Sequence, residues 1–169
     1  MPVLETPRLS LREFQFEDLD ALAAILSDPE TMSYYPMSFD RAGVADWIQR
    51  NRTRYANDGY GLWAMILKST RELIGDCGLV RQSVDGVDEI EIGYHVRRDL
   101  WGQGFATEAD RACRDFGFAN LEADRLISLI RPENLASRRV AEKNGMTIWK
   151  ETTRVNLLHY VYAIKRDQV

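Results

Sequence analysis

The sequence predicts a mixed α/β (α+β) fold, in which helices cover the faces of a central mixed sheet. Alternating and short apolar segments, which are typical of strands, recur along the chain and are separated by segments with helical periodicity. Their order predicts about seven strands and about four helices. A long helical segment lies between the strands expected at residues 89–96 and 125–130. That spacing allows a parallel crossover, so we expect a mostly antiparallel sheet with one parallel pair.

The first expected strand covers residues 3–16, where Leu9 and Leu11 alternate with polar side chains. Asp18 is expected to cap a helix that ends at Asp28-Pro29. Its apolar stripe has helical spacing and consists of Leu19, Leu22, Ala23, Ile25 and Leu26.

A second helix is predicted at residues 39–56, and Asp58-Gly59 closes it. Its apolar side carries Val44, Trp47, Ile48 and Tyr55. Two strands follow at residues 60–67 and 73–81, and the short polar link between them predicts an antiparallel hairpin. Asp85-Gly86 predicts another tight turn before the next strand.

The C-terminal part of the chain contains a short apolar strand at residues 125–130 and a helix at residues 136–144. Gly145 is expected to stop that helix. Two further strands are predicted at residues 146–153 and 157–165. We find no repeat, linker or low-complexity segment, and we therefore expect one domain that spans residues 1–169.

Composition excludes several classes of protein. Of the 169 residues, 45% are hydrophobic and 28% are charged, as in ordinary globular domains. The formal charge of −4 provides no basic footprint, so no nucleic-acid partner is expected. An acidic balance favours cationic partners such as amines without identifying them.

Two cysteines and two histidines, far apart in sequence, form neither a disulfide framework nor a zinc motif, so no metal is expected. The N-terminal segment lacks the apolar core of a signal peptide, and no run has the length of a membrane span. We therefore expect a cytoplasmic protein without a membrane partner. Composition leaves the choice between monomer and homodimer open.

The expected strand at residues 89–96 has two chemically different faces. One face looks like core and carries Ile90, Ile92, Tyr94 and Val96. The other presents carboxylates to an approaching ligand and carries Glu89, Glu91, Gly93 and His95. Gly93 predicts a bulge or a close approach of another backbone.

A turn with two glycines, Gly102 and Gly104, follows that strand and opens a helix. A buried stripe is expected on the helix, formed by Phe105, Ala109, Ala112 and Phe116. Backbone N–H groups that converge at a helix N-terminus bind anions such as a pyrophosphate. The spacing matches neither a dinucleotide fingerprint nor a P-loop, so the turn alone is equally compatible with a purely structural role.

The run Trp101-Gly102-Gln103-Gly104-Phe105-Ala106 resembles motif A of the GNAT acetyltransferases, Gln/Arg-x-x-Gly-x-Gly/Ala. Gly104 and Ala106 match, whereas Trp101 stands where Gln or Arg is usual. That departure is typical of the RimJ/RimL-like N-terminal acetyltransferases, which often read Y-W-G-x-G-Y-A-T-E-A. Residues 6–12 and 134–146 also resemble this subgroup, T-x-R-L-x-L-R and N-x-x-S-x-x-V-x-E-K-x-G-F. The resemblance therefore covers nearly the whole chain.

The resemblance implies a GNAT-like fold that binds acetyl-CoA where two parallel strands splay apart. It implies that the backbone of Tyr94, His95 and Val96 holds the pantetheine arm. It also implies that the pyrophosphate is held by backbone amides of Trp101, Gly102, Gln103, Gly104, Phe105, Ala106 and Thr107. Asn134 and Ser137 are expected to contact the cofactor from the second splayed strand's side.

Acetyl transfer to an amine requires a neutral amine, a stabilised oxyanion and a protonated leaving thiolate. Glu91 is the candidate base, acting through a water, and His95 is an alternative. Ser137 is a candidate donor to the leaving sulfur, because Ala141 stands where many GNAT enzymes carry a tyrosine that acts as the general acid. Each residue also has a structural alternative. Glu91 is then a solvated residue on an exposed strand face, and Ser137 is an ordinary hydroxyl at a helix N-terminus.

The acceptor is expected to be a primary amine, with a peptide or protein N-terminus favoured. A small amine such as an amino acid, a polyamine or an antibiotic is the second hypothesis, and a non-catalytic acyl-CoA-binding module is the third. Tyr34, Tyr35 and Trp63 are candidates for the acceptor pocket, whereas core packing is favoured for Trp47.

Overall fold

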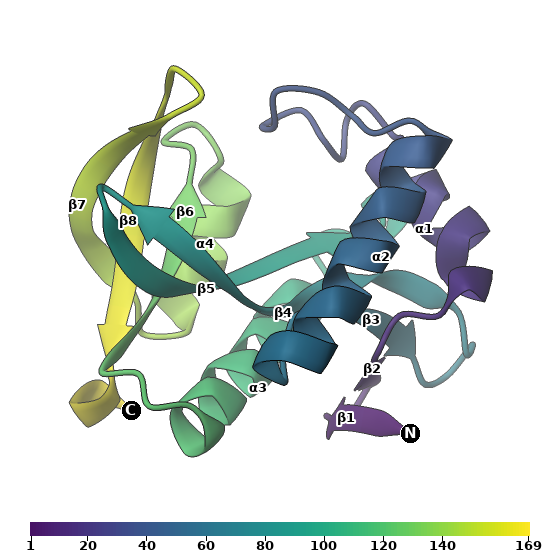
Figure 1. The fold of residues 1–169 in the computed structure, drawn as a ribbon, viewed down its shortest axis with the longest axis horizontal. Coiled ribbons are helices and arrows are strands. Elements are labelled where there is room, and N and C mark those ends of the chain that lie inside the picture. The colour runs from purple at the N-terminus through teal and green to yellow at the C-terminus, as the bar shows by residue number, and fades with distance from the viewer.

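The computed structural model describes residues 1–169 and contains an eight-stranded sheet with the order β1-β2-β3-β4-β5-β6-β8-β7 (Figure 1). The strands are β1 (Pro2–Glu5), β2 (Leu9–Arg12), β3 (Leu62–Leu67), β4 (Leu73–Val84), β5 (Val87–Val96), β6 (Arg125–Ile130), β7 (Thr147–Arg154) and β8 (Leu157–Lys165). The helices are α1 (Leu19–Leu26), α2 (Arg41–Asp58), α3 (Phe105–Asn120) and α4 (Leu135–Lys143). β5 and β6 are parallel and every other neighbouring pair is antiparallel. The predicted fold class is confirmed, including the crossover through α3.

The sheet has one strand more than expected because residues 3–16 form two strands. The chain reverses after Glu5, where the Thr6 N–H donates to the Leu9 carbonyl at 2.9 Å. The Thr6 hydroxyl oxygen also accepts from the Leu9 N–H at 3.0 Å. Pro7, which has no N–H to offer a strand partner, sits at the reversal.

The expected helix caps give one correction and one confirmation. Asp18 does not cap α1, because its carboxylate accepts hydrogen bonds from the Arg12 guanidinium at 2.7 and 2.8 Å and from the Gln15 N–H at 2.8 Å. Its position just before the helix is therefore explained by an ion pair. Gly59 ends α2 as expected, with a left-handed φ of 80°.

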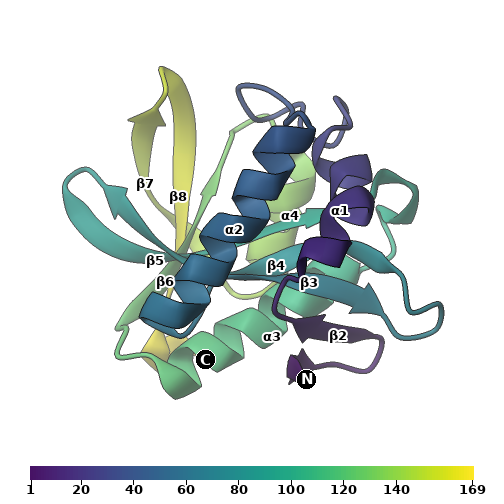
Figure 2. The ribbon, with the colours of Figure 1, turned by 45° about the vertical axis from the view of Figure 1, so that its right-hand side comes forward.

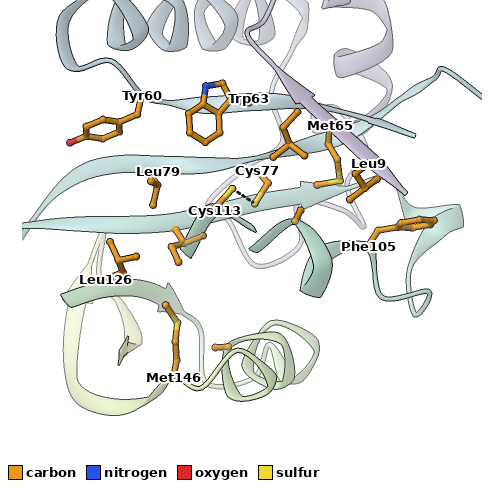
Figure 3. Packing of buried hydrophobic residues seen from close by; sticks show 14 of the residues in the cluster. Leu9, Tyr60, Trp63, Met65, Cys77, Leu79, Phe105, Cys113, Leu126 and Met146 are labelled. Carbon is orange, nitrogen blue, oxygen red and sulfur yellow. Dashed lines mark hydrogen bonds between the residues drawn. The ribbon is translucent and has the colours of Figure 1, made fainter. Parts of the chain in front are cut away.

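The two larger of three hydrophobic cores lie on the two faces of the sheet. In β3, Trp63 and Met65 point into the larger core, whereas Ala64 points into the smaller core beneath α1 and α2, as strand alternation requires. Figure 3 shows the larger core, where Trp63, Cys77 and neighbouring side chains on the strands lie opposite α3. The Cys77 and Cys113 sulfur atoms approach to 3.5 Å as free thiols.

The buried stripe of α3 matches the expected one at two residues and is shifted by one position at the other two. Phe105, Ala109, Cys113 and Gly117 are buried, while Ala112 is half-buried and Phe116 packs at the margin of the core. The observed residues recur every four positions along the helix, which places them on one side of it. None of the four helices has both the length and the apolar composition that a membrane crossing requires.

β5 and β6 separate soon after they meet. They pair at Glu91 and Ile127, and the Ser128 hydroxyl then donates to the Ile92 carbonyl at 2.9 Å. The next β6 amide, Leu129 N–H, faces the Glu91 side chain at 3.4 Å. Figures 1 and 2 show α2 on one side of this part of the fold and the β7–β8 hairpin on the other.

Candidate active site

A cavity of about 450 Å³ lies where β5 and β6 diverge. Its walls come from the segment after α1, from α2, β5 and β6, from the start of α4 and from the turn between β7 and β8. The lining residues that were expected from sequence are Tyr34, Tyr35, Glu91, Tyr94, His95, Asn134 and Ser137. The fold thus gathers candidate base, cofactor and acceptor residues around one space.

The glycine turn presents a run of free backbone amides outside this cavity. Gly102 and Gly104 have left-handed φ values of 74° and 82°, and Gly104 is the N-cap of α3. The N–H groups from Gly102 to Thr107 donate to no protein acceptor, and the first intrahelical bond runs from Glu108 N–H to the Gly104 carbonyl. Free amides at the positive end of a 16-residue helix fit a pyrophosphate.

Glu108 ties this turn to the first hairpin. Its carboxylate accepts from the Thr6 hydroxyl at 2.6 Å, from the Arg8 N–H at 2.9 Å and from Arg8 Nε at 2.6 Å. Although burial opposes the shift, these hydrogen bonds hold the pKa of Glu108 below its ordinary value. Arg8 also donates to the Gln103 carbonyl at 2.9 Å and stacks over Phe105. Two of the sequence motifs are therefore parts of one structural unit.

The backbone of β5 divides its hydrogen bonds between β4 and the open side. Because the Arg97 N–H donates to the Ile74 carbonyl, the antiparallel alternation also directs His95 toward β4. Tyr94 and Val96 point the other way, and the Val96 carbonyl accepts from Trp101 Nε1 at 2.7 Å. The expectation for His95 as a backbone ligand is corrected, because only its two neighbours have backbone groups on the open side.

Glu91 projects into the cavity at the point of strand divergence. Burial raises the pKa of its carboxyl, outweighing the hydrogen bonds that favour the ionised form. Glu89, on the same face, does not line the cavity, and its carboxylate forms an ion pair with Arg125. Gly93 lines the cavity without a bulge, and a Cβ there would meet only Leu62 at 3.7 Å.

Ser137 lies opposite, at the start of α4. Its hydroxyl oxygen accepts from the Tyr94 hydroxyl at 3.0 Å, and its N–H donates to the Asn134 side chain at 3.2 Å. Burial raises the pKa of Tyr94, which keeps this phenol protonated as a donor. The Ser137 proton therefore remains available to a second acceptor. Ala141 lines the cavity one helical turn further on.

His95 belongs to a buried polar chain that the sequence interpretation missed. Its Nδ1 lies 2.8 Å from Asp76 Oδ1, and Asp76 Oδ2 accepts from Trp47 Nε1 at 3.0 Å. A carboxylate oxygen can accept from Nδ1–H, and in the neutral imidazole with that tautomer the lone pair lies on Nε2. Nε2 is buried without a partner, and the Tyr35 ring lies 5.0 Å from the imidazole. The two-residue turn at Asp85-Gly86 sets the β4–β5 register, which places Asp76 opposite His95. The sequence could have predicted the Asp76–His95 contact from that turn.

The prediction for Trp63 is corrected, and the one for Trp47 is confirmed and extended. Trp63 is 1% exposed, packs edge-on against Phe116 and does not line the cavity. Trp47 lines the cavity, although it also packs against the smaller core. A continuous apolar strand does not reveal which of its aromatic side chains faces a ligand.

Four arginines also line the cavity, and sequence reasoning passed over them: Arg50, Arg54, Arg131 and Arg154. Two of them were detectable, because Trp47, Arg50 and Arg54 recur at helical spacing and share one face of α2. Arg131 and Arg154 lie just beyond β6 and at the end of β7, where only the folded chain brings them close.

Comparison with known proteins agrees with this arrangement. A family model described as an acetyltransferase (GNAT) domain matches residues 8–147. The protein YkkB of Bacillus subtilis (strain 168) is 38% identical over 163 residues, covering 96% of this chain and 95% of the relative.

Solved structures show the same fold. A GNAT-family acetyltransferase from Bacillus anthracis superposes with a TM-score of 0.82 and 28% identity, covering 97% of this chain and 98% of the other. The ribosomal-protein-S5-alanine acetyltransferase of Vibrio fischeri gives a TM-score of 0.79 at 14% identity, with 97% and 96% covered. At that identity the second similarity concerns the fold alone.

Proposed function

The chain belongs to the GNAT acetyltransferase family, and from this membership we propose that it acetylates the α-amine of a peptide or protein N-terminus. It is an acetyl-CoA-dependent N-acetyltransferase. The observation that carries the proposal is the cavity at the strand divergence. There Glu91 faces the space for an acceptor, while Ser137 and Tyr94 meet on the side of α4.

The residues present fit acetyl-CoA. The free amides from Gly102 to Thr107 would hold its pyrophosphate, and the backbone groups of Tyr94 with the Val96 N–H would hold the pantetheine arm, since the Val96 carbonyl already accepts from Trp101. When bound, the cofactor supplies an activated acetyl group as a thioester. Glu108 and Arg8 keep the amide run in place, since they fix the turn from outside.

Glu91 would accept the proton of the incoming amine, directly or through a water. Its raised pKa makes it a better base than an exposed glutamate while leaving it ionised above that pKa. His95 is the alternative base, because Asp76 directs the lone pair to Nε2. Ser137 would donate its free proton toward the departing sulfur.

An α-amine suits this modest machinery. At pH 7 an α-amine with a pKa near 8 costs about 1.4 kcal/mol to deprotonate, whereas a lysine with a pKa near 10.4 costs about 4.6 kcal/mol. A single carboxylate of raised pKa can offset the deprotonation cost of an α-amine more readily than the larger cost of a lysine. The ribosomal-protein acetyltransferase of Vibrio fischeri is named for acetylating a protein alanine, which is consistent with an N-terminal acceptor on this fold.

The proposal is tested by measuring CoA release from acetyl-CoA with two matched peptides. One has a free α-amine and a blocked lysine, and the other has a blocked α-amine and a free lysine. We expect kcat/KM to favour the free α-amine by more than about a hundredfold, since the two pKa values differ by about 2.4 units. Equal rates would refute the preference for an α-amine.

Glu91→Gln is expected to lower kcat/KM by about 10²-fold, the usual contribution of a general base. Glu17→Gln is the matched control, because Glu17 is exposed and does not line the cavity. An unchanged rate in Glu91→Gln, with His95→Gln inactive, would transfer the role to the histidine. Tight CoA binding without acetylation of any amine would instead identify a non-catalytic module.

A further inference from the structure

The cavity carries a charge opposite to that of the whole chain. The sequence has 22 basic and 26 acidic residues, yet the cavity is lined by four arginines and by two carboxylic acids, Glu91 and Asp110. Burial raises the pKa of Asp110 to about 7, so this carboxyl is only partly ionised at neutral pH. The space around the acceptor is therefore locally basic.

Three of these arginines make hydrogen bonds or ring contacts only with neutral groups, although the charge of Glu91 also acts on Arg54 and Arg154. Arg50 lies over the Trp47 ring, and Arg54 donates to the Asn51 side chain at 3.1 Å. Arg154 donates to the Ser83 carbonyl at 3.0 Å and to the Gln82 side chain at 3.2 Å. A guanidinium has five N–H donors, so each keeps donors for an anion.

The neighbouring positive charges also act on one another. Burial and the charge of Arg50 together lower the pKa of Arg54. Arg131 forms an ion pair with Glu133, but its Nε is buried without a hydrogen-bond partner. Both features raise the free energy of the protein without a ligand. An anion in the cavity would stabilise the positive charge of Arg54 and accept a hydrogen bond from Arg131 Nε.

The arginines are placed apart from the expected phosphate site. The turn residues 101–107 do not line the cavity, and the amides there already provide an anion site of their own. Arg50 and Arg54 come from α2 and Arg154 from the end of β7, and the charges of Arg54 and Arg154 act on Glu91, the candidate base that faces the acceptor. The anion that they fit is consequently part of the acceptor.

We propose that the acceptor amine carries a carboxylate close to the amino group, which Arg50, Arg54 and Arg154 recognise. This inference rests on the proposed acetylation of an amine and specifies its substrate class. Two sources share the chemistry: an acidic side chain next to a peptide N-terminus, and the α-carboxylate of a free amino acid. Polyamines and aminoglycosides, which bear only positive charges, are disfavoured by the same arginines.

The expected preference is set by one or two charge-assisted hydrogen bonds. Each contributes about 1.5–3 kcal/mol, or roughly ten- to a hundredfold in affinity.

C-terminally amidated tetrapeptides Ser-Asp-Ala-Ala and Ser-Asn-Ala-Ala differ only in one charge. Serine and serinamide form the second pair and test the free amino acid as the source. We expect the carboxylate member of at least one pair to have a kcat/KM higher by about tenfold or more.

Arginine variants assign the preference to the cavity. Arg50→Gln is expected to lower the ratio between paired acceptors by about tenfold, whereas Arg154→Lys keeps the charge and retains part of the ratio. Arg71→Gln is the control. Arg71 lies in the exposed turn between β3 and β4, so this substitution removes the same charge away from the cavity. Circular dichroism of each variant checks the fold.

Calorimetric titration of the same acceptor pairs, with CoA present, measures the preference without turnover. Preferential binding of the carboxylate member without any acetylation would support this inference and overturn the proposed function. Acetylation at equal rates within both pairs would overturn this inference and leave the proposed function standing. A preference that survives unchanged in Arg50→Gln and in Arg154→Gln would also overturn it.

Discussion

Replacing Gly104 by valine is expected to abolish cofactor binding at a modest cost in stability. Gly104 has a φ of 82°, and a Cβ at this position would meet only the Arg8 guanidinium, at 3.4 Å. The left-handed conformation costs an ordinary L-residue about 1–2 kcal/mol, which a domain of this size tolerates. The substitution therefore acts on the local backbone and not on the core.

The effect on the cofactor is expected to be much larger than the effect on stability. A valine relieves its strain by moving φ toward negative values, and this rotates the free amides between Gly102 and Thr107. Loss of two hydrogen bonds to a phosphate, at about 1.5–3 kcal/mol each, weakens CoA binding by at least about 10²-fold. Calorimetric titration with CoA and urea denaturation measure the two effects separately.

Gly59→Val is the matched control. Gly59 has a φ of 80°, and a Cβ there would meet no heavy atom within 4 Å, so the backbone cost is the same. Gly59 ends α2 and does not line the cavity. Unchanged CoA affinity in Gly104→Val, or an equal loss in Gly59→Val, would refute the assignment of the amide run to the cofactor.

Three further outcomes are expected. Glu108→Gln is expected to lower the free energy of unfolding by about 1–3 kcal/mol and to weaken CoA binding, because charged hydrogen bonds from Thr6–Arg8 are lost; unchanged values in urea denaturation and calorimetry would contradict this. Asp110 has a pKa of about 7 when folded and 3.8 ordinarily, so the wild type is expected to lose up to about 1.4 kcal/mol of stability per pH unit as the pH rises between these values. Urea midpoints from pH 4 to 7 should show a steeper loss in the wild type than in Asp110→Asn, in which Glu91 still contributes, and parallel curves would count against it. Cys77 and Cys113 are buried and burial raises the pKa of Cys77, so a thiol reagent such as DTNB should react only after unfolding, and fast reaction of the native protein would be inconsistent with the core.

Periodicity predicted the fold well where one face of an element is buried. The alternation in β5 separated Ile92 and Val96 from Glu91, and in the structure Ile92 and Val96 belong to the larger core whereas Glu91 lines the cavity and takes no part in that core. Alternation predicted less well at residues 3–16, because Leu9 and Leu11 gave no sign of the turn at Thr6 that Glu108 stabilises.

The candidate site was predictable in proportion to how local its parts are. The amide run lies within a few consecutive residues, so the turn, the helix start and the family resemblance together were enough to propose it. The Asp76–His95 pair required the register of a hairpin, and the cluster of Arg50, Arg131 and Arg154 required the packing of three distant segments. Side chains that meet only through tertiary structure leave no periodic pattern in the sequence.

The link between Thr6 and Glu108 has a consequence for the order in which the protein forms. The two residues are 102 positions apart, so the contact is made late and closes a long loop. During synthesis the first hairpin emerges well before α3, so Thr6 cannot bond to Glu108 until α3 has also been synthesised. We expect the cofactor turn to mature after the central hairpins have folded, so that a nascent chain gains CoA affinity in a late step.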